Sequence, residues 1–293
     1  MTLELPELTL ACVDTREPAF ALQAMQRSMS GIGFGDAVLF TETRLVSEPP
    51  DCIRIIDARV DGIDAYSRFM LHGLLEHIRT PHLLVVQWDG FVTRPAAWRR
   101  EFLDFDYIGA RWHDRPRESS VGNGGFSLRS RRLLEALRDP AVRMSHPEDI
   151  CICVHNRELL ERRHGIRFAP PEVAERFSYE RLPPPGATFG FHGLFNLPQE
   201  LPRDELRSFL RAMPDGLARS LDAHDLCRRL IAVGALTEAD ELLAKRRRLR
   251  MHDRRTLRLH WQLRVARWRQ ALCTVTHADW THEPPPGRSE GGS

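Results

Sequence analysis

Four apolar runs in the N-terminal part of the chain have the length and composition of buried β-strands. They are residues 8–13, 37–40, 53–56 and 82–87. Short runs of this kind, rich in Val, Ile and Leu, are typical of strands that are covered on both faces of a sheet. We therefore expect these four segments to belong to one sheet.

Helical patterns separate the strands. Residues 19–25 repeat apolar residues at helical spacing, and Asp64 can cap a second helix whose apolar face extends to residue 78, before Thr80-Pro81 ends it. This alternation predicts an α/β domain with helices on both faces of the sheet. Neither a GxGxxG fingerprint nor a GxxxxGK[ST] phosphate loop follows the first strand, so the two most familiar nucleotide-binding loops are not indicated.

The second half of this domain is less regular. We expect short strands over residues 107–109, 166–168 and 189–191, and helices over residues 130–137 and 147–163.

After Pro198 the pattern becomes helical. Residues 226–243 have the helix–glycine–helix texture of a tetratricopeptide half-repeat, although a single unit does not make an array. The end of the chain has the composition of a disordered tail. We therefore expect an α/β domain over residues 1–199, a small all-α region over residues 200–270 and a disordered tail over residues 271–293.

Charge is distributed unevenly along the chain. The totals nearly balance, with 42 Lys and Arg against 40 Asp and Glu, so no overall attraction to polyanions is expected. Residues 245–269, however, hold eleven Lys or Arg and one acid, and their apolar residues (Leu249, Leu257, Leu259, Trp261, Leu263 and Trp268) indicate an amphipathic helix with a solvated basic face. Because no nucleic-acid motif accompanies this segment, we favour the solvated face over a contact with nucleic acid, and the helical tail is a candidate surface for a protein partner.

The remaining composition indicates a globular protein of the cytoplasm. The six cysteines include no CxxC pair and are typical of reduced thiols. Residues 1–6 do not have the pattern of a signal peptide, and no apolar run reaches the length of a membrane-spanning helix.

One candidate for chemistry is Asp89, in the segment Gln87-Trp88-Asp89-Gly90 directly after the most apolar strand. Ligands gather at the carboxyl ends of strands in open α/β sheets, and a carboxylate there suits Mg²⁺ or Mn²⁺ with a bound phosphate. The alternative is an aspartate that caps the next turn, and spacing alone favours it.

A second candidate pair is Glu148-Asp149, at the start of an expected helix. Acids in a first helical turn are stabilised by the helix dipole, which is a structural explanation for both. The functional alternative is a general base, which needs a carboxylate held in a cleft.

Two further candidates are a glycine-rich turn and a late histidine. The turn, with Asn123, Gly124 and Gly125 at its centre, is either a plain hairpin turn or a place where the backbone approaches a ligand closely. His192 lies among aromatic residues, where a packed core histidine is the common case and a metal ligand the alternative.

Sequence blocks in a fixed order make these candidates more specific. The blocks are HLLVVQWDGFV, FDYIGARW, VGNGGFSLRS, HPEDICIC, IRFAP, ERFSYE and TFGFHGLFN. With them, residues 8–196 resemble a bacterial family of unassigned function that is related to nucleotide-sugar-dependent glycosyltransferases of the GT-A fold. The order matches a DxD motif, a glycine-rich loop, an xED motif and a late histidine. The resemblance implies a Rossmann-type mixed sheet flanked by helices.

The resemblance implies roles for the charged candidates. Asp89 stands at the last acid of the DxD motif and would bind Mn²⁺ or Mg²⁺ together with His192. Gln87 replaces the first acid of that motif, so the usual contact there is altered. Asp149 stands at the final acid of the xED motif, next to Glu148, and would be the catalytic base of an inverting enzyme.

The resemblance also implies how the donor is held. Asp14 and Thr15, after the first strand, would hold the nucleotide together with Gln87 and Trp88. The loop with Asn123, Gly124 and Gly125 would line the region of the acceptor and the donor sugar.

We therefore expect a metal-dependent glycosyltransferase that moves a sugar from a nucleotide donor, in the first place a UDP-sugar, to a hydroxyl of a glycan, lipid or protein. The alternative is a catalytically inactive module of the same fold that acts through its helical tail. A sugar-phosphate nucleotidyltransferase ranks last, because the glycine-rich loop expected after its first strand is missing.

Overall fold

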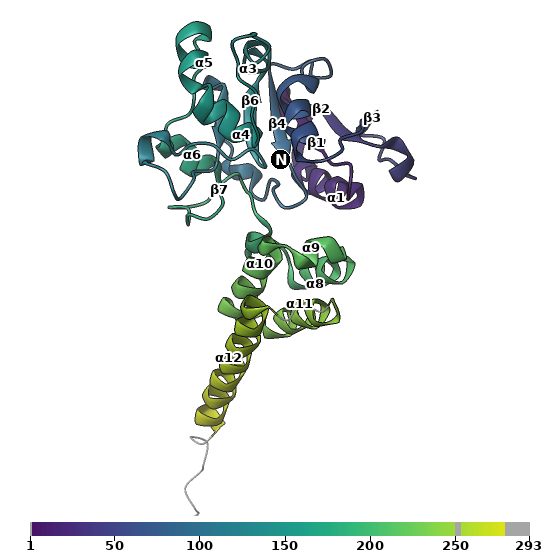
Figure 1. Ribbon diagram of the computed structural model, residues 1–293, viewed down its shortest axis with the longest axis vertical. Helices are drawn as coiled ribbons and strands as arrows, with labels where there is room; N and C mark the ends of the chain where they lie inside the picture. Colours follow the sequence, from purple (N-terminus) through teal and green to yellow (C-terminus); the bar gives the residue numbers. More distant parts are fainter. Residues whose placement is uncertain (1, 250–252, 279–293) are drawn as a thin grey trace, which may run out of the picture. The chain divides into compact units, whose positions relative to one another are not determined.

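The computed structural model describes residues 2–249 and 253–278. The chain divides into two compact units, Met1–Asn196 and Leu197–Ser293, so the first unit ends three residues before the predicted boundary at residue 199. Figure 1 shows the first unit as strands and helices and the second as helices.

The first unit contains a six-stranded mixed sheet with the order β3-β2-β1-β4-β6-β5. Four neighbouring strands are parallel, and β6 runs antiparallel to β4 and β5. The strands are β1 (Leu3–Val13), β2 (Ile32–Thr41), β3 (Arg54–Asp57), β4 (His82–Val86), β5 (Tyr107–Gly109) and β6 (Ser127–Ser130). This confirms the predicted α/β class with its mixed sheet.

The sheet is covered on both faces, which explains the apolar runs of its central strands. Successive side chains of β4 alternate between two cores: Leu83 and Val85 face one, and Leu84 and Val86 face the other. The first core is completed by α2 (Ile63–Arg68), α3 (Arg131–Ala136) and α5 (Arg157–His164), and the second by α1 (Pro18–Met29) and α6 (Pro171–Phe177). Each fully buried Leu or Val contributes about 1.5–3 kcal/mol to folding.

Two predicted helices differ from the structure. The first helix does not begin at Asp64, because its N-cap is Gly62, at a φ of +90°, and Asp64 lies in the first turn of α2. The helix then passes into a π-helical turn that ends at Gly73, well before Thr80. The helix expected over residues 147–163 is broken into α4 (Glu148–Ile150), a π-helical turn and α5. The break occurs because the Asn156 side chain donates hydrogen bonds to the backbone carbonyls of Cys151 and Arg143.

The last strands of this unit also differ from the prediction. Residues 166–168 form no named strand, although Phe168 makes an isolated bridge with Tyr107. The unpredicted strand β7 (Ser178–Tyr179) pairs in parallel with β8 (Gly190–Phe191), and this small sheet holds the backbone next to His192.

The second unit is all-α within the described residues. Its helices are α7 (Leu197–Glu200), α8 (Arg203–Ala212), α9 (Asp215–Arg219), α10 (Leu221–Ala232), α11 (Leu236–Arg248) and α12 (Arg254–Ala278). Gly234, at a φ of +76°, makes the turn of the α10–α11 hairpin. Because α12 continues to Ala278, residues 271–278 are helical and not part of the predicted tail, and the rest of that tail lies outside the described residues.

The apolar residues of the basic segment do not share one face, contrary to the prediction. Leu259 and Leu263 are buried, whereas Leu257, Trp261 and Trp268 are exposed. The predicted solvated basic face is also interrupted, because Arg246 is buried and donates a hydrogen bond to the carbonyl of Ala218. None of the described helices is long and apolar enough to cross a bilayer.

Candidate functional site

Gln87, Trp88 and Asp89 form a tight turn directly after β4. The backbone of Gln87 exchanges two hydrogen bonds with Gly90, at N···O distances of 2.9 and 3.0 Å, which places Trp88 and Asp89 at the tip. The Gln87 side chain points to the carboxyl edge of the sheet, where its Nε2 donates to the Tyr66 hydroxyl at 2.7 Å.

Asp14 and Thr15 lie at the same edge, at the end of the neighbouring strand β1. Asp14 Oδ1 accepts hydrogen bonds from the backbone N–H groups of Arg16 and Glu17, and Thr15 Oγ1 donates to the carbonyl of Val60. Burial raises the pKa of Asp14, and these N–H bonds only partly oppose it. With Tyr66, Gln87 and Trp88, both residues line a cavity of about 220 Å³.

His192 lies between two carboxylates, one on each side of its ring. Its Nε2 is 3.6 Å from Asp89 Oδ1, and its Nδ1 is 3.6 Å from Glu180 Oε1. The backbone fixes this arrangement, because His192 N donates to the carbonyl of Tyr179 and Gly193 N donates to that of Asp89. The imidazole is 18% exposed, so its charge state is set mainly by these neighbours.

Burial by itself lowers the pKa of His192, but the charges of Asp89 and Glu180 and the hydrogen bond that the ring donates to Glu180 outweigh it and raise the pKa to about 9. Burial likewise acts to raise the pKa of Glu180, yet its interactions with His192 leave that pKa below the ordinary value. At neutral pH the imidazole is therefore protonated, and a cation that binds its Nε2 has to displace this proton.

The glycine-rich loop approaches this cluster so closely that side chains are excluded. A Cβ on Gly125 would lie 2.1 Å from His192 Nε2, and one on Gly124 would lie 2.2 Å from Glu148 Oε1. Asn123 adopts a left-handed φ of 62°, which Asn tolerates better than most residues, and its Nδ2 is 3.1 Å from His192 Nδ1. The loop backbone thus comes close to His192 and Glu148, while its predicted approach to a ligand stays a prediction.

Glu148 and Asp149 have different environments although they are adjacent. Asp149 is half-buried, and its Oδ2 accepts a hydrogen bond from Gly124 N at 3.2 Å. Glu148 is buried, with its Oε1 at 3.2 Å from Nη2 of the fully buried Arg129. Arg129 Nε also donates to Ser127 Oγ at 3.0 Å. Glu148 thus belongs to a buried ion pair behind the loop, whereas the Asp149 carboxylate is held by the loop backbone, and both residues line the same cavity.

These residues surround a second cavity of about 350 Å³, which shares Gln87 with the first. Asp89 is not among the residues that line either cavity and contacts the site through His192. The predicted residues that line the second cavity are Gln87, Asn123, Gly124, Gly125, Glu148, Asp149 and His192.

Four site residues were missed by the sequence reasoning: Tyr66, Arg129, Glu180 and Arg181. Glu180 is the last residue of the ERFSYE block, so its place in that block was the available signal. Arg181 follows it and lines the second cavity. Arg129 lies in the VGNGGFSLRS block and had the same kind of signal as Glu180. Tyr66 carried no signal, because only the packing of α2 brings it to the site.

Asp89 and His192 could supply two ligands to a cation whose other ligands come from a bound phosphate. Asp89 Oδ1 and Gln87 Oε1 both lie near His192 Nε2, the latter at 3.2 Å, whereas Glu180 lies on the other ring nitrogen. Within residues 2–249 and 253–278, no three His, Cys, Asp or Glu side chains are grouped to hold a metal. One carboxylate is nevertheless enough for Mg²⁺ when phosphates and waters supply the rest, and a carboxylate on the far nitrogen is what orients a histidine that binds a metal.

Comparisons with known proteins are limited. A family described as "Protein of unknown function (DUF5672)" matches residues 51–192, just under half of the chain. The matched segment includes Asp89, the glycine-rich loop and Asp149, and it ends at His192. No curated protein matches the chain.

Among solved structures, the chain is similar to a glycosyltransferase involved in the glycosylation of the major capsid of PBCV-1. The two are 13% identical with a TM-score of 0.39, and the match covers 63% of this chain and 91% of that one.

Proposed function

We propose that the first unit is a glycosyltransferase that moves a sugar from a nucleoside diphosphate donor to an acceptor hydroxyl. One observation carries the proposal: two cavities meet at Gln87 on the carboxyl edge of the sheet, and Asp149 and His192 both line the second. A two-part ligand with a nucleotide in one cavity and a sugar in the other matches this geometry. The resemblance of the sequence blocks to GT-A enzymes supports the same reaction.

The leaving group of this reaction is a diphosphate, which gains negative charge as the bond to the sugar breaks. A divalent cation, when bound, would supply charge stabilisation there, and Asp89 and His192 would hold it. Glu180 positions the His192 ring through the far nitrogen at 3.6 Å. Gln87 hydrogen-bonds both Tyr66 and His192, and so holds the boundary between the two cavities as a neutral group.

Asp149 is proposed as the general base that takes the proton of the acceptor hydroxyl. Its carboxylate is held by Gly124 N and Ile150 N, so it is oriented before the acceptor binds. Glu148 does not share this role in our proposal, because its carboxylate is engaged by Arg129 behind the loop.

A binding module without turnover is the second candidate. The observation that favours it is the neutral Gln87 in place of the first acid of the DxD motif, which leaves one carboxylate, Asp89, in that turn. Such a module would bind the same donor but would not release nucleoside diphosphate from it.

A thermal-shift series tests the proposal. Nucleoside diphosphates and nucleotide sugars are added with and without Mn²⁺ to the wild type, to Asp89→Ala and to the exposed control Asp104→Ala. A ligand at a hundred times its Kd stabilises the folded state by about 2.7 kcal/mol, or several degrees for a unit of this size. We expect one nucleotide to give a Mn²⁺-dependent shift that Asp89→Ala abolishes and Asp104→Ala retains.

Release of nucleoside diphosphate from the stabilising donor then separates the two candidates. Turnover supports the transferase, and binding without turnover in the presence of glycan, lipid and peptide acceptors supports the module. The absence of any nucleotide-dependent shift contradicts both.

A further inference from the structure

Helix α12 carries a stripe of exposed apolar side chains. The stripe consists of Leu257, Trp261, Trp268 and Leu272, which are 55%, 66%, 64% and 45% exposed. At 100° per residue these four side chains fall within one sector of about 60°. The buried Leu259 and Leu263 lie on the opposite side of the helix, so α12 packs within its unit through a different apolar face.

Arginines flank the stripe on both sides. At the same helical spacing, Arg264 lies on one edge, and Arg258 and Arg269 lie on the other. The helix contains six Arg and no Asp or Glu. Arg267 pairs with Asp240 of α11 at 3.2 Å, but it lies away from the stripe.

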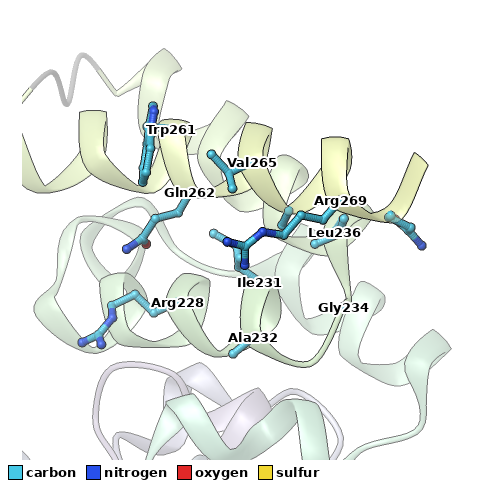
Figure 2. A pocket seen from close by; sticks show the side chains of 11 residues that line it. Arg228, Ile231, Ala232, Gly234, Leu236, Trp261, Gln262, Val265 and Arg269 are labelled. Atoms are coloured by element: carbon cyan, nitrogen blue, oxygen red, sulfur yellow. The ribbon is translucent and has the colours of Figure 1, made fainter. Parts of the chain in front are cut away.

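An open groove of about 680 Å³ extends the stripe toward α10. Trp261 and Val265 of α12 and Ile231 and Leu236 of the α10–α11 hairpin line it. Figure 2 shows the Arg269 side chain extending from α12 over this groove. The apolar surface of the stripe therefore continues into this groove, and the guanidinium of Arg269 lies beside it.

The charge pattern selects the occupant of this face. A second copy of the chain would bring six further arginines and no acid on its own α12, so two such helices would repel each other. A nucleic-acid backbone would pair with the arginines but would leave two Trp and two Leu in the middle of the contact. An anionic bilayer surface offers phosphates on both sides of the helix and apolar depth beneath it, and Trp is a residue favoured at that boundary.

We propose that α12 binds anionic membrane surfaces, lying in the interface with Trp261 and Trp268 toward the lipid. This inference rests on the second unit alone and does not depend on the transferase assignment. Each arginine near an anionic surface should strengthen binding about fivefold, and each buried Trp about tenfold or more.

Vesicle co-sedimentation of the full chain tests the proposal. The vesicles contain phosphatidylcholine alone or with a third of phosphatidylglycerol, at low and high salt. The variants are Trp261→Ser/Trp268→Ser and Arg258→Gln/Arg264→Gln. The control is Leu45→Ser/Arg162→Gln, which changes an exposed leucine and an exposed arginine of the first unit. Circular dichroism verifies that all of them are folded.

We expect binding to the anionic vesicles only, weakened by salt, lowered at least tenfold in both α12 variants and unchanged in the control. Absence of binding to anionic vesicles at low salt would overturn the proposal. Loss in the arginine variant with full binding in the tryptophan variant would also overturn it, because the attraction would then be to any polyanion. A dimer that only the tryptophan variant dissociates, without vesicle binding, would assign the face to a second copy instead.

Discussion

The two units of this protein place their charged side chains in different ways. At the sheet edge of the first unit, His192 lies at ion-pair distance from Asp89 and Glu180, and the buried Arg129 pairs with Glu148. On α12 of the second unit, guanidinium groups lie on the surface beside exposed tryptophans. Fixed buried charges suit a ligand whose groups must be placed accurately, whereas an exposed mixed face suits an extended surface. Substitutions of these buried charges in the first unit should therefore be costly, and those of exposed residues on α12 should hardly change folding.

The largest expected effect is on turnover. Asp149→Asn keeps the shape of the side chain but removes its ability to accept a proton, so transfer should slow by about 10²–10⁴-fold. Release of nucleoside diphosphate measures this rate, and an unchanged thermal midpoint shows that the fold is intact. Asp104→Asn, an exposed control outside both cavities, should stay at the wild-type rate. A full rate in Asp149→Asn would exclude it as the base.

The next effect concerns the ion pair behind the loop. Arg129→Met leaves Glu148 buried without its cation, which should cost about 3–5 kcal/mol and lower the thermal midpoint by roughly 6–20 °C. The double variant Arg129→Met/Glu148→Met should recover much of this loss, because no charge then remains buried. Arg162→Met, at an exposed position, is the control. If the single variant were as stable as the control, the pair would have no structural role.

A smaller effect is expected from a single methyl group at the loop. Gly125→Ala places a Cβ at 2.1 Å from His192 Nε2, so the loop or the imidazole has to move. This should lower the free energy of unfolding by about 1–3 kcal/mol. Gly186→Ala is a matched control, because a Cβ there meets nothing within 4 Å. Denaturant unfolding and nucleotide-induced thermal shifts should both change in Gly125→Ala and not in Gly186→Ala. Equal behaviour of the two would mean that the loop adapts freely.

The second unit also has a fixed buried charge, and acid should reveal it. Hydrogen bonds from Arg203 and Arg207 lower the pKa of the buried Glu238 carboxyl from 4.5 to about 2. Because the folded-state pKa lies below the unfolded one, this stabilisation is present above about pH 4.5 and is lost as the pH falls toward 2. The loss should be about 2 kcal/mol, since the exposed Arg203 is screened by solvent. Unfolding of Glu238→Gln should lack this part of the pH dependence, and an identical profile would contradict the assignment.

The smallest expected effect is on the folding of α12. Trp261→Ser and Trp268→Ser remove exposed side chains, so each should change the free energy of unfolding by no more than about 0.5 kcal/mol. Chemical denaturation measures this, with the buried Leu263→Ser as the contrasting variant that should lose several times more. A large loss in the tryptophan variants would show that the stripe supports the fold of its unit.

Much of the fold could be predicted because it follows from local pattern. The runs at residues 8–13 and 82–87 became β1 and β4, since a central parallel strand needs apolar side chains on both faces. The break after residue 150 was missed because a helical pattern of apolar residues does not reveal that Asn156 bonds the backbone of Cys151. The split of α12 into two apolar faces was missed for a related reason: the pattern shows which residues are apolar, but the packing of α10 and α11 decides which of them are covered.

The sequence by itself determined the class of the fold, the change to helices after Pro198, and the residue types able to bind phosphate, metal or protons. Only the tertiary structure decided how they meet. It placed Glu180 and Asp89 on opposite sides of the His192 ring and paired Glu148 with the buried Arg129. It also brought Gly125 so close that no Cβ fits. The physical reason is that strand and helix periodicities arise from neighbours along the chain. The pKa of a side chain and the need for a glycine depend instead on groups that are distant in sequence and adjacent in space.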